Sequence, residues 1–164
     1  MRFKSSNFAH QPICMRLRIP PALVMLIFGA LMYVLAKFLP VGDFDFFGRN
    51  ELAWFLFGLG FLIGIVAVAQ FIITRTTTDP LHPQKTSKLI TRGVFNYTRN
   101  PMYLGLLLIL LAFGLKLGNA FNTLLAAGFV SYINRFQIKY EEEVLEEKFG
   151  KEYRIFCKLT RRWF

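Results

Sequence analysis

The chain has 164 residues, of which 54% are hydrophobic, and its mean hydropathy of +0.41 is high for a soluble domain. Its net charge of +10 does not indicate a nucleic-acid-binding protein, because no basic stripe with interleaved aromatic residues occurs and six of the ten acidic residues lie within 141–152. We predict no disulfide and no metal site, because two cysteines lie far apart and neither histidine belongs to a ligand cluster (Cys14, Cys157, His10 and His82).

The first apolar run predicts a membrane-spanning helix over 19–39. The run follows a basic segment, 1–18, that contains no acidic residue. Within 19–39, Lys37 is the single charged residue. A signal peptide also begins with basic residues, but this run is too long for a signal-peptide core and no small-residue cleavage site follows it. We therefore expect a retained span.

A second span is predicted over 51–73. Gln70 is the only strongly polar residue in 52–73, and a helix of that length can cross about 30 Å of hydrocarbon. Gly60 and Gly64 form a pair of small residues one helical turn apart, which would let a neighbouring helix approach closely.

The polar connections set the expected orientation. The short connection 40–50 contains glycine, aspartate and arginine, whereas 74–101 holds five basic residues against one acid, Asp79. Since cytoplasmic loops carry an excess of lysine and arginine, we expect 74–101 and both termini to be cytoplasmic.

Two further apolar segments, 102–117 and 120–140, predict a helical hairpin closed at Gly118. The second helix continues to about Phe149 with increasing polarity, and spacing by three and four residues places polar side chains on two adjoining faces. These faces are Ser131, Arg135, Ile138 and Glu142, and Asn134, Ile138, Glu141 and Leu145. Such residues face a cavity or partner, or the helix simply leaves the membrane into water.

The remaining segment, 141–164, is expected to form a cytoplasmic tail. Gly150 should interrupt the helix, and basic and aromatic residues alternate from Lys151 to Trp163, which suits an amphipathic segment on an anionic membrane surface. The sequence therefore predicts one all-α, polytopic membrane domain, 1–164, with four spans.

The stretch from Thr91 to Gly105 gathers two arginines, two tyrosines, a proline and two glycines before an apolar helix, and we expect the chemistry there. Together with a second stretch, it resembles the isoprenylcysteine carboxyl methyltransferase family, which is related to phospholipid methyltransferases. The matching residues are R-G-V-F at 92–95, Y-T-R-N-P-M-Y-L-G at 97–105, E-E-E-V-L at 141–145, F-G at 149–150 and Tyr153.

The resemblance covers about the C-terminal half and implies a small helical membrane enzyme. Such an enzyme binds S-adenosylmethionine on the cytoplasmic side and methylates a lipid-embedded or otherwise hydrophobic acceptor. The cofactor-binding residues implied are Arg92, Gly93, Tyr97, Arg99, Asn100, Pro101, Tyr103, Gly105, Glu141 and Glu142.

Physical chemistry suggests a role for each type of side chain. The two arginines can hold the cofactor carboxylate by forked hydrogen bonds, the two glutamates can accept from its ammonium or ribose, and the tyrosines can wall the adenine or face the sulfonium. Family members often have histidine where this chain has Asn100; asparagine cannot titrate near neutrality, so we expect it to position the loop.

For catalysis we single out Arg135 and Glu142. An arginine is costly facing lipid, so we expect Arg135 to point into the hairpin, toward the acceptor or the glutamates. Glu143, Glu146 and Glu147 are expected on a solvated face. Two other interpretations stay open: a membrane reductase of the sterol-reductase type, and a membrane scaffold without enzymatic activity.

Overall fold

The computed structural model describes residues 19–39, 42–74, 86 and 88–164, and within them it contains helices, turns and one isolated β-bridge. The all-α prediction is confirmed for this part of the chain. The elements are α1 (Pro21–Phe38), α2 (Arg49–Ile73), the 3-10 turn η2 (Gly93–Asn96), α3 (Pro101–Leu117), α4 (Asn122–Ile133), the π-helical segment η3 (Asn134–Ile138), α5 (Lys139–Phe149) and α6 (Lys151–Leu159).

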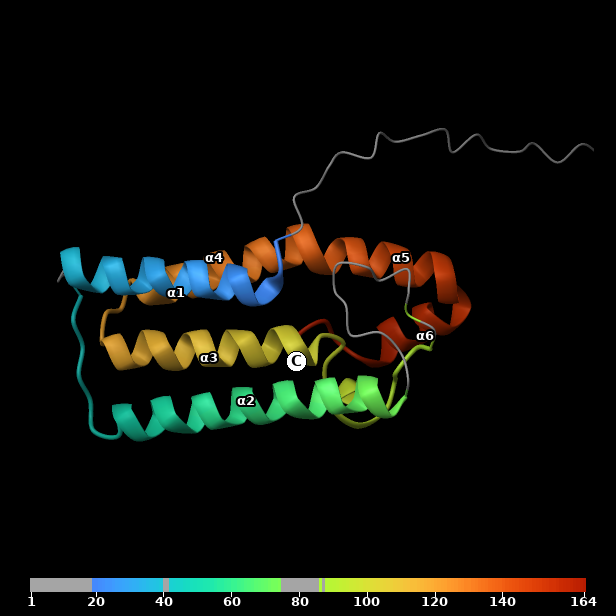
Figure 1. Ribbon diagram of the computed structural model, residues 1–164, viewed down its shortest axis with the longest axis horizontal. Helices are drawn as coiled ribbons and strands as arrows, with labels where there is room; N and C mark the ends of the chain where they lie inside the picture. The colour runs from blue at the N-terminus through green and yellow to red at the C-terminus, as the bar shows by residue number, and fades with distance from the viewer. Residues whose placement is uncertain (1–18, 40–41, 75–85, 87) are drawn as a thin grey trace, which may run out of the picture.

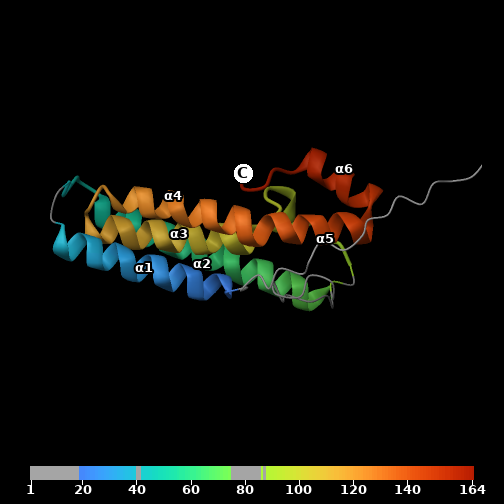
Figure 2. The same cartoon turned by 90° about the horizontal axis from the view of Figure 1, so that it is seen from above.

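The first four α-helices lie side by side as an elongated bundle, and α5 and α6 extend from one end of it (Figures 1 and 2). Helix α3 packs against α1, α2 and α4. The core between α1, α3 and α4 contains Met32, Leu110, Phe129 and Ile133, all buried. The central position of α3 matters because its first turn carries part of the predicted site.

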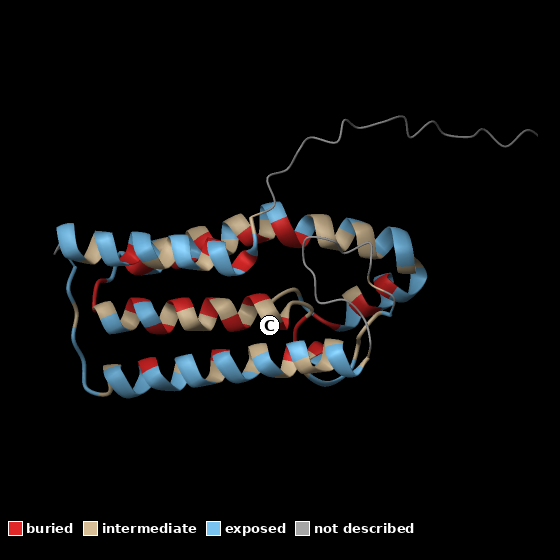
Figure 3. Ribbon diagram, in the orientation of Figure 1, coloured by how far each residue is buried: buried red, intermediate tan, exposed pale blue. Residues whose placement is uncertain are grey.

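Helices α1 and α2 match the first two predicted spans. They have 18 and 25 residues, and both are long and apolar enough to cross a membrane; α3, with 17 residues, is a shorter apolar helix. Pro21 begins α1 at a position where its missing N–H costs no hydrogen bond. The outward sides of α1 and α2 are largely exposed (Figure 3) and carry large apolar side chains such as Leu26, Trp54 and Phe55, as helices in lipid do.

Glycines bring α2 and α3 into close contact, as the small-residue pair predicts. A Cβ atom added at Gly60 would lie 2.7 Å from the Gly105 carbonyl oxygen, and one added at Gly105 would lie 2.7 Å from the Gly60 carbonyl oxygen. The Gly64 backbone nitrogen would lie 3.2 Å from the same Gly105 Cβ. The predicted close approach of a neighbouring helix is therefore confirmed, and the neighbour is α3.

At the opposite end from α6, α3 ends where it was predicted to end. Gly118 has φ 70°, which a glycine adopts without steric cost, and α4 begins four residues later at Asn122. The turn is held to the connection between α1 and α2 by a hydrogen bond from Phe44 N to Gly118 O, 2.9 Å long.

The fourth predicted helix is continuous, but it is not regular. The π-helical segment η3 joins α4 to α5, and its wider turn rotates α5 relative to the ideal helical period. Ser131 and Arg135, at or before the start of this segment, are exposed, whereas Ile138 at its end is buried and Glu142 beyond it is half-buried. The prediction that these four residues share one face is wrong, because it assumed 3.6 residues per turn throughout.

Gly150 separates α5 from α6, as predicted, with φ 50° and ψ −113°. Part of the apolar side of α6 packs against protein, however. Tyr153 and Phe156 are buried in a cluster with Phe95 of η2, so much of the predicted membrane-surface segment is packed against protein. Leu159 remains exposed.

Candidate functional site

The predicted site lies at the α5–α6 end of the bundle, where three segments meet. The segment before α3, the start of α5 and residues 160–164, which we call the strap, are joined by hydrogen bonds. The strap carbonyl of Arg162 accepts from Thr98 Oγ1 at 3.2 Å and from Asn100 Nδ2 at 2.9 Å. The backbone N–H of Arg99 donates to the Arg161 carbonyl at 2.9 Å.

Glu142 is the charged centre of this arrangement. Its carboxylate accepts hydrogen bonds from Arg162 Nε at 3.0 Å and Arg162 Nη2 at 2.5 Å, and it lies 3.1 Å from Arg99 Nη2. The side chains of Glu142 and Arg99 are only 21% and 14% exposed. Two guanidinium groups therefore hold one carboxylate in a largely desolvated position, where charge-assisted hydrogen bonds are strong.

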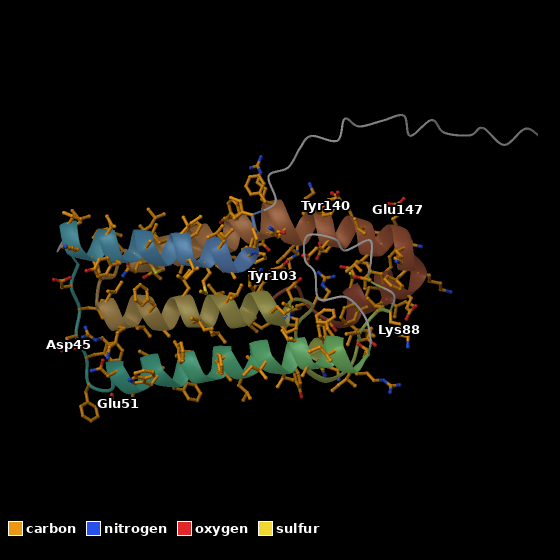
Figure 4. The ribbon with its side chains drawn as sticks, in the orientation of Figure 1. Asp45, Glu51, Lys88, Tyr103, Tyr140 and Glu147 are labelled. Atoms are coloured by element: carbon orange, nitrogen blue, oxygen red, sulfur yellow. The ribbon has the colours of Figure 1, made fainter. Side chains whose placement is uncertain are left out.

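The neighbouring glutamate, Glu141, is held by a residue of α3. The Tyr103 phenol on α3 donates a hydrogen bond to Glu141 Oε1 on α5, and Tyr103 itself is buried. Figure 4 shows Tyr103 at the end of α3 that is nearest to α5, whereas the labelled Glu147 lies on the outer side of α5. Glu143, Glu146 and Glu147 are exposed, as predicted.

Two ionisable groups beside Glu142 have shifted pKa values. Burial raises the pKa of the Tyr153 phenol, and the nearby Cys157 thiol and Glu142 carboxylate add to this effect. The hydrogen bond to Glu142 raises the pKa of the Arg162 guanidinium. The charge on Arg162 is therefore fixed at physiological pH, and Tyr153 stays neutral.

A cavity of about 710 Å³ lies at this site, and its volume is in the range of about 300–1,000 Å³ typical of small-molecule sites. One end is polar, with Arg99, Glu141 and Glu142, and the buried rings of Phe95 and Phe156 stand in its wall. The rest of the lining is mainly apolar and comes chiefly from α2, α3, the start of α1 and the segment 88–90.

Seven of the predicted site residues line this cavity together. They are Arg99, Asn100, Pro101, Tyr103, Gly105, Glu141 and Glu142. Pro101 and Gly105 also have structural tasks, since Pro101 begins α3 and Gly105 contacts α2.

Four predicted residues do not belong to the lining. Arg92 is exposed, and Tyr97 is 81% exposed. Gly93, with φ 68°, lies against Gln70 of α2, because a Cβ there would be 1.6 Å from Gln70 Nε2. Arg135 is exposed, with its guanidinium carbon 5.9 Å from the Phe136 ring centroid. The expectation that Arg135 points inward is wrong, because the wider turn of η3 separates the exposed face of Arg135 from the half-buried face of Glu142. The functional roles of these four residues stay predictions.

The sequence interpretation missed Arg162 entirely, because its basic and aromatic surroundings suit a lipid surface equally well. It also missed the aromatic wall of Phe95 and Phe156, for which the i, i+3 pair Tyr153 and Phe156 on a short helix was the available signal.

Among the residues that the structure describes, no group of three or more histidine, cysteine, aspartate or glutamate side chains is placed to hold a metal ion. Cys157 is a free thiol. His10, Cys14 and His82, on which the metal and disulfide predictions also rest, lie outside the described residues.

Comparison with known proteins gives two matches. The family model for phospholipid methyltransferase matches residues 49–152, which is more than half of the chain. A Haemophilus influenzae protein described as uncharacterized is 55% identical over 62 residues, which are 38% of this chain and 98% of that protein. No solved structure matches significantly. The matched region of the family model contains α2, α3, α4 and α5 and thus both halves of the site, so the chain belongs to the phospholipid methyltransferase family, which includes the isoprenylcysteine carboxyl methyltransferases.

Proposed function

We propose that this protein is an S-adenosylmethionine-dependent membrane methyltransferase that acts on a hydrophobic or lipid-linked acceptor, with O-methylation of an isoprenylcysteine-like carboxylate as the first reaction to test. The observation that carries the proposal is the cavity itself. One end presents two carboxylates and the largely buried Arg99 guanidinium, and the remaining wall is mainly apolar, with Thr86 and Lys88 as its polar members. A charged cofactor and an apolar acceptor can share such a space.

The proposal includes one membrane domain, 1–164, with spans at about 19–39, 51–73, 102–117 and 120–140. Loop 74–101, tail 141–164 and both termini are cytoplasmic in this arrangement. Charge supports this orientation, since the site end carries many basic side chains, including Lys139, Lys148, Lys151, Lys158 and Arg161. The connection 40–50 at the other end contains two aspartates and one basic residue, Arg49.

The residues at the polar end fit the cofactor. Arg99 Nε is buried and, among the described residues, has no hydrogen-bond partner, so this guanidinium still has a donor for a ligand carboxylate. Glu141 and Glu142 supply acceptors for an ammonium or hydroxyl groups, and the rings of Phe95 and Phe156 offer an apolar surface to an adenine. When bound, the cofactor supplies a methyl group on an activated sulfonium.

The task left to the chain is to orient the reactants and exclude water. The two guanidinium groups fix Glu142, and Tyr103 fixes Glu141, so the polar end is ordered. A carboxylate or thiolate acceptor needs no general base. An amine acceptor must lose a proton, and a glutamate at this end can accept it.

Direct binding of S-adenosylhomocysteine to folded, detergent-solubilised protein, measured by calorimetry, tests the cofactor assignment. We expect Glu142→Ala and Arg99→Ala each to weaken binding about tenfold or more, because each removes a charge-assisted contact. Glu146→Ala is the matched control, since Glu146 is exposed and pairs with Arg154 on the outer side at 3.5 Å. Equal effects of all three variants would contradict the assignment, and no binding by folded wild type would reject the proposal.

The acceptor requires a separate experiment. Membrane lipids and prenylated cysteine analogues are incubated with enzyme and methyl donor, and mass spectrometry follows the gain of one CH₂ unit. Thermal stabilisation by a nicotinamide dinucleotide and not by S-adenosylhomocysteine would instead indicate the reductase. A partner that co-purifies and is lost on mutating Glu142, with no cofactor effect, would indicate the scaffold.

A further inference from the structure

The strap of residues 160–164 returns to the site, where side-chain and backbone hydrogen bonds hold it in place. Trp163 Nε1 donates to Asn134 Oδ1 of η3 at 3.0 Å, and Thr160 is buried. The Arg162 carbonyl lies against Thr98 and Asn100. Arg162 is thus anchored on both sides, by the segment before α3 and by the π-helical segment.

The geometry at Glu142 shows what this anchoring achieves. Arg162 uses a forked pair of donors, Nε and Nη2, and engages both carboxylate oxygens. Arg99 reaches only Oε1, through Nη2. Because Arg162 satisfies the carboxylate, Arg99 is not drawn into a forked pair of its own, and its buried Nε is left without a partner among the described atoms.

We propose that Arg162 is a positioning residue of the site: it holds the Glu142 carboxylate and so leaves Arg99 available to the carboxylate of the methyl donor. This inference rests on the proposed function. It also gives Asn100 a task, since the Asn100 amide donates to the backbone of Arg162 and helps to fix it. A group that cannot titrate suffices for this contact.

The inference makes a selective prediction about ligands. S-adenosylhomocysteine carries the amino-acid end that Arg99 and Glu142 would recognise, whereas 5′-methylthioadenosine has the adenosine and thioether without it. Calorimetry with both ligands is carried out on wild type, Arg162→Ala, Arg162→Lys and Arg161→Ala. Arg161 is the matched control, because its side chain is exposed and it contacts Arg99 through its backbone carbonyl.

We expect Arg162→Ala to weaken S-adenosylhomocysteine binding about tenfold or more and to change 5′-methylthioadenosine binding less than about twofold. Arg162→Lys keeps the charge without the fork and should fall between wild type and alanine; it also serves if the alanine variant does not fold. In a Glu142→Gln background, Arg162→Ala should cost much less, because the two residues act as one unit.

Equal weakening of both ligands would show that the strap only maintains the fold, and additive effects of the two substitutions would show that Arg162 does not act through Glu142. Either result overturns the inference while the proposed function stands. If folded wild type binds neither ligand, the proposed function fails and the inference fails with it.

Discussion

The phenol of Tyr103 donates a hydrogen bond to the carboxylate of Glu141, and this contact joins the first turn of α3 to the first turn of α5. Tyr103 is 5% exposed, so the interaction lies where water competes little. Because hydrogen bonds to charged groups contribute about 1.5–3 kcal/mol, Tyr103→Phe should lower the thermal unfolding temperature by several degrees in detergent. Tyr33→Phe, at a half-exposed position on α1, is the control and should leave it unchanged. If the two variants had the same unfolding temperature, this role of Tyr103 would be contradicted.

Gly60 provides a test of the helix contact. A Cβ at this position would lie 2.7 Å from a backbone oxygen of α3 and 2.9 Å from the Leu108 Cβ, so Gly60→Ala must push α2 and α3 apart. We expect a loss of about 1–3 kcal/mol, as for other overpacked contacts, seen as a lower unfolding temperature.

Gly58→Ala is the matched control on the same helix, since nothing lies within 4 Å of its added Cβ. There the substitution should be neutral or stabilising by about 0.5–1 kcal/mol, because alanine favours helices. If Gly60→Ala were as stable as Gly58→Ala, the close contact would not exist in the protein.

The parts of the structure that the sequence predicts best are those governed by local chemistry. The apolar runs predicted α1 and α2 closely. Helices α3 and α5 end next to Gly118 and Gly150, where glycine was expected to end a helix. The two matched motifs predicted that Arg99 and Glu142 would belong to one pocket, and the structure brings their side chains to 3.1 Å, although the direct ion pair between them was not predicted. The number of membrane crossings remains a proposal.

The parts of the structure that the sequence predicts poorly depend on tertiary contacts. The π-helical segment cannot be read from periodicity, because a single wider turn leaves the apolar pattern on each side intact. Arg135 was therefore assigned to the wrong face. Arg162 was missed for a related reason. An arginine among aromatic residues can face either a lipid surface or protein, and only the tertiary structure shows that Arg162 contacts Glu142.

Deleting one residue from η3 should show whether its wider turn positions the site. Phe136 is partly exposed and stands within the segment, so its removal would convert the π turn to an α-helical one. Helix α5 would then rotate by about 100° relative to α4 and carry Glu141 and Glu142 away from Tyr103 and Arg99. We expect binding of S-adenosylhomocysteine to be lost while circular dichroism shows unchanged helix content.

The control for that deletion is Phe136→Ala, which removes the ring but keeps the residue count and should bind nearly as wild type does. Normal ligand binding by the deletion variant would mean that the orientation of α5 does not depend on η3.

The stability of the fold at alkaline pH should depend on Tyr153. Burial raises the pKa of its phenol above the ordinary value. Below about pH 10, the ordinary pKa of tyrosine, the phenol is protonated in both folded and unfolded chains, and its contribution to stability is fully present. As pH rises further, the unfolded tyrosine ionises while the folded one keeps its proton, so that contribution is lost progressively toward the folded pKa. The loss is about 1.4 kcal/mol per pH unit for one such group. Tyr153→Phe should therefore show a shallower fall of unfolding temperature between about pH 9 and 11 than wild type. Tyr33→Phe should keep the steep fall, and identical slopes in both variants would refute the assignment.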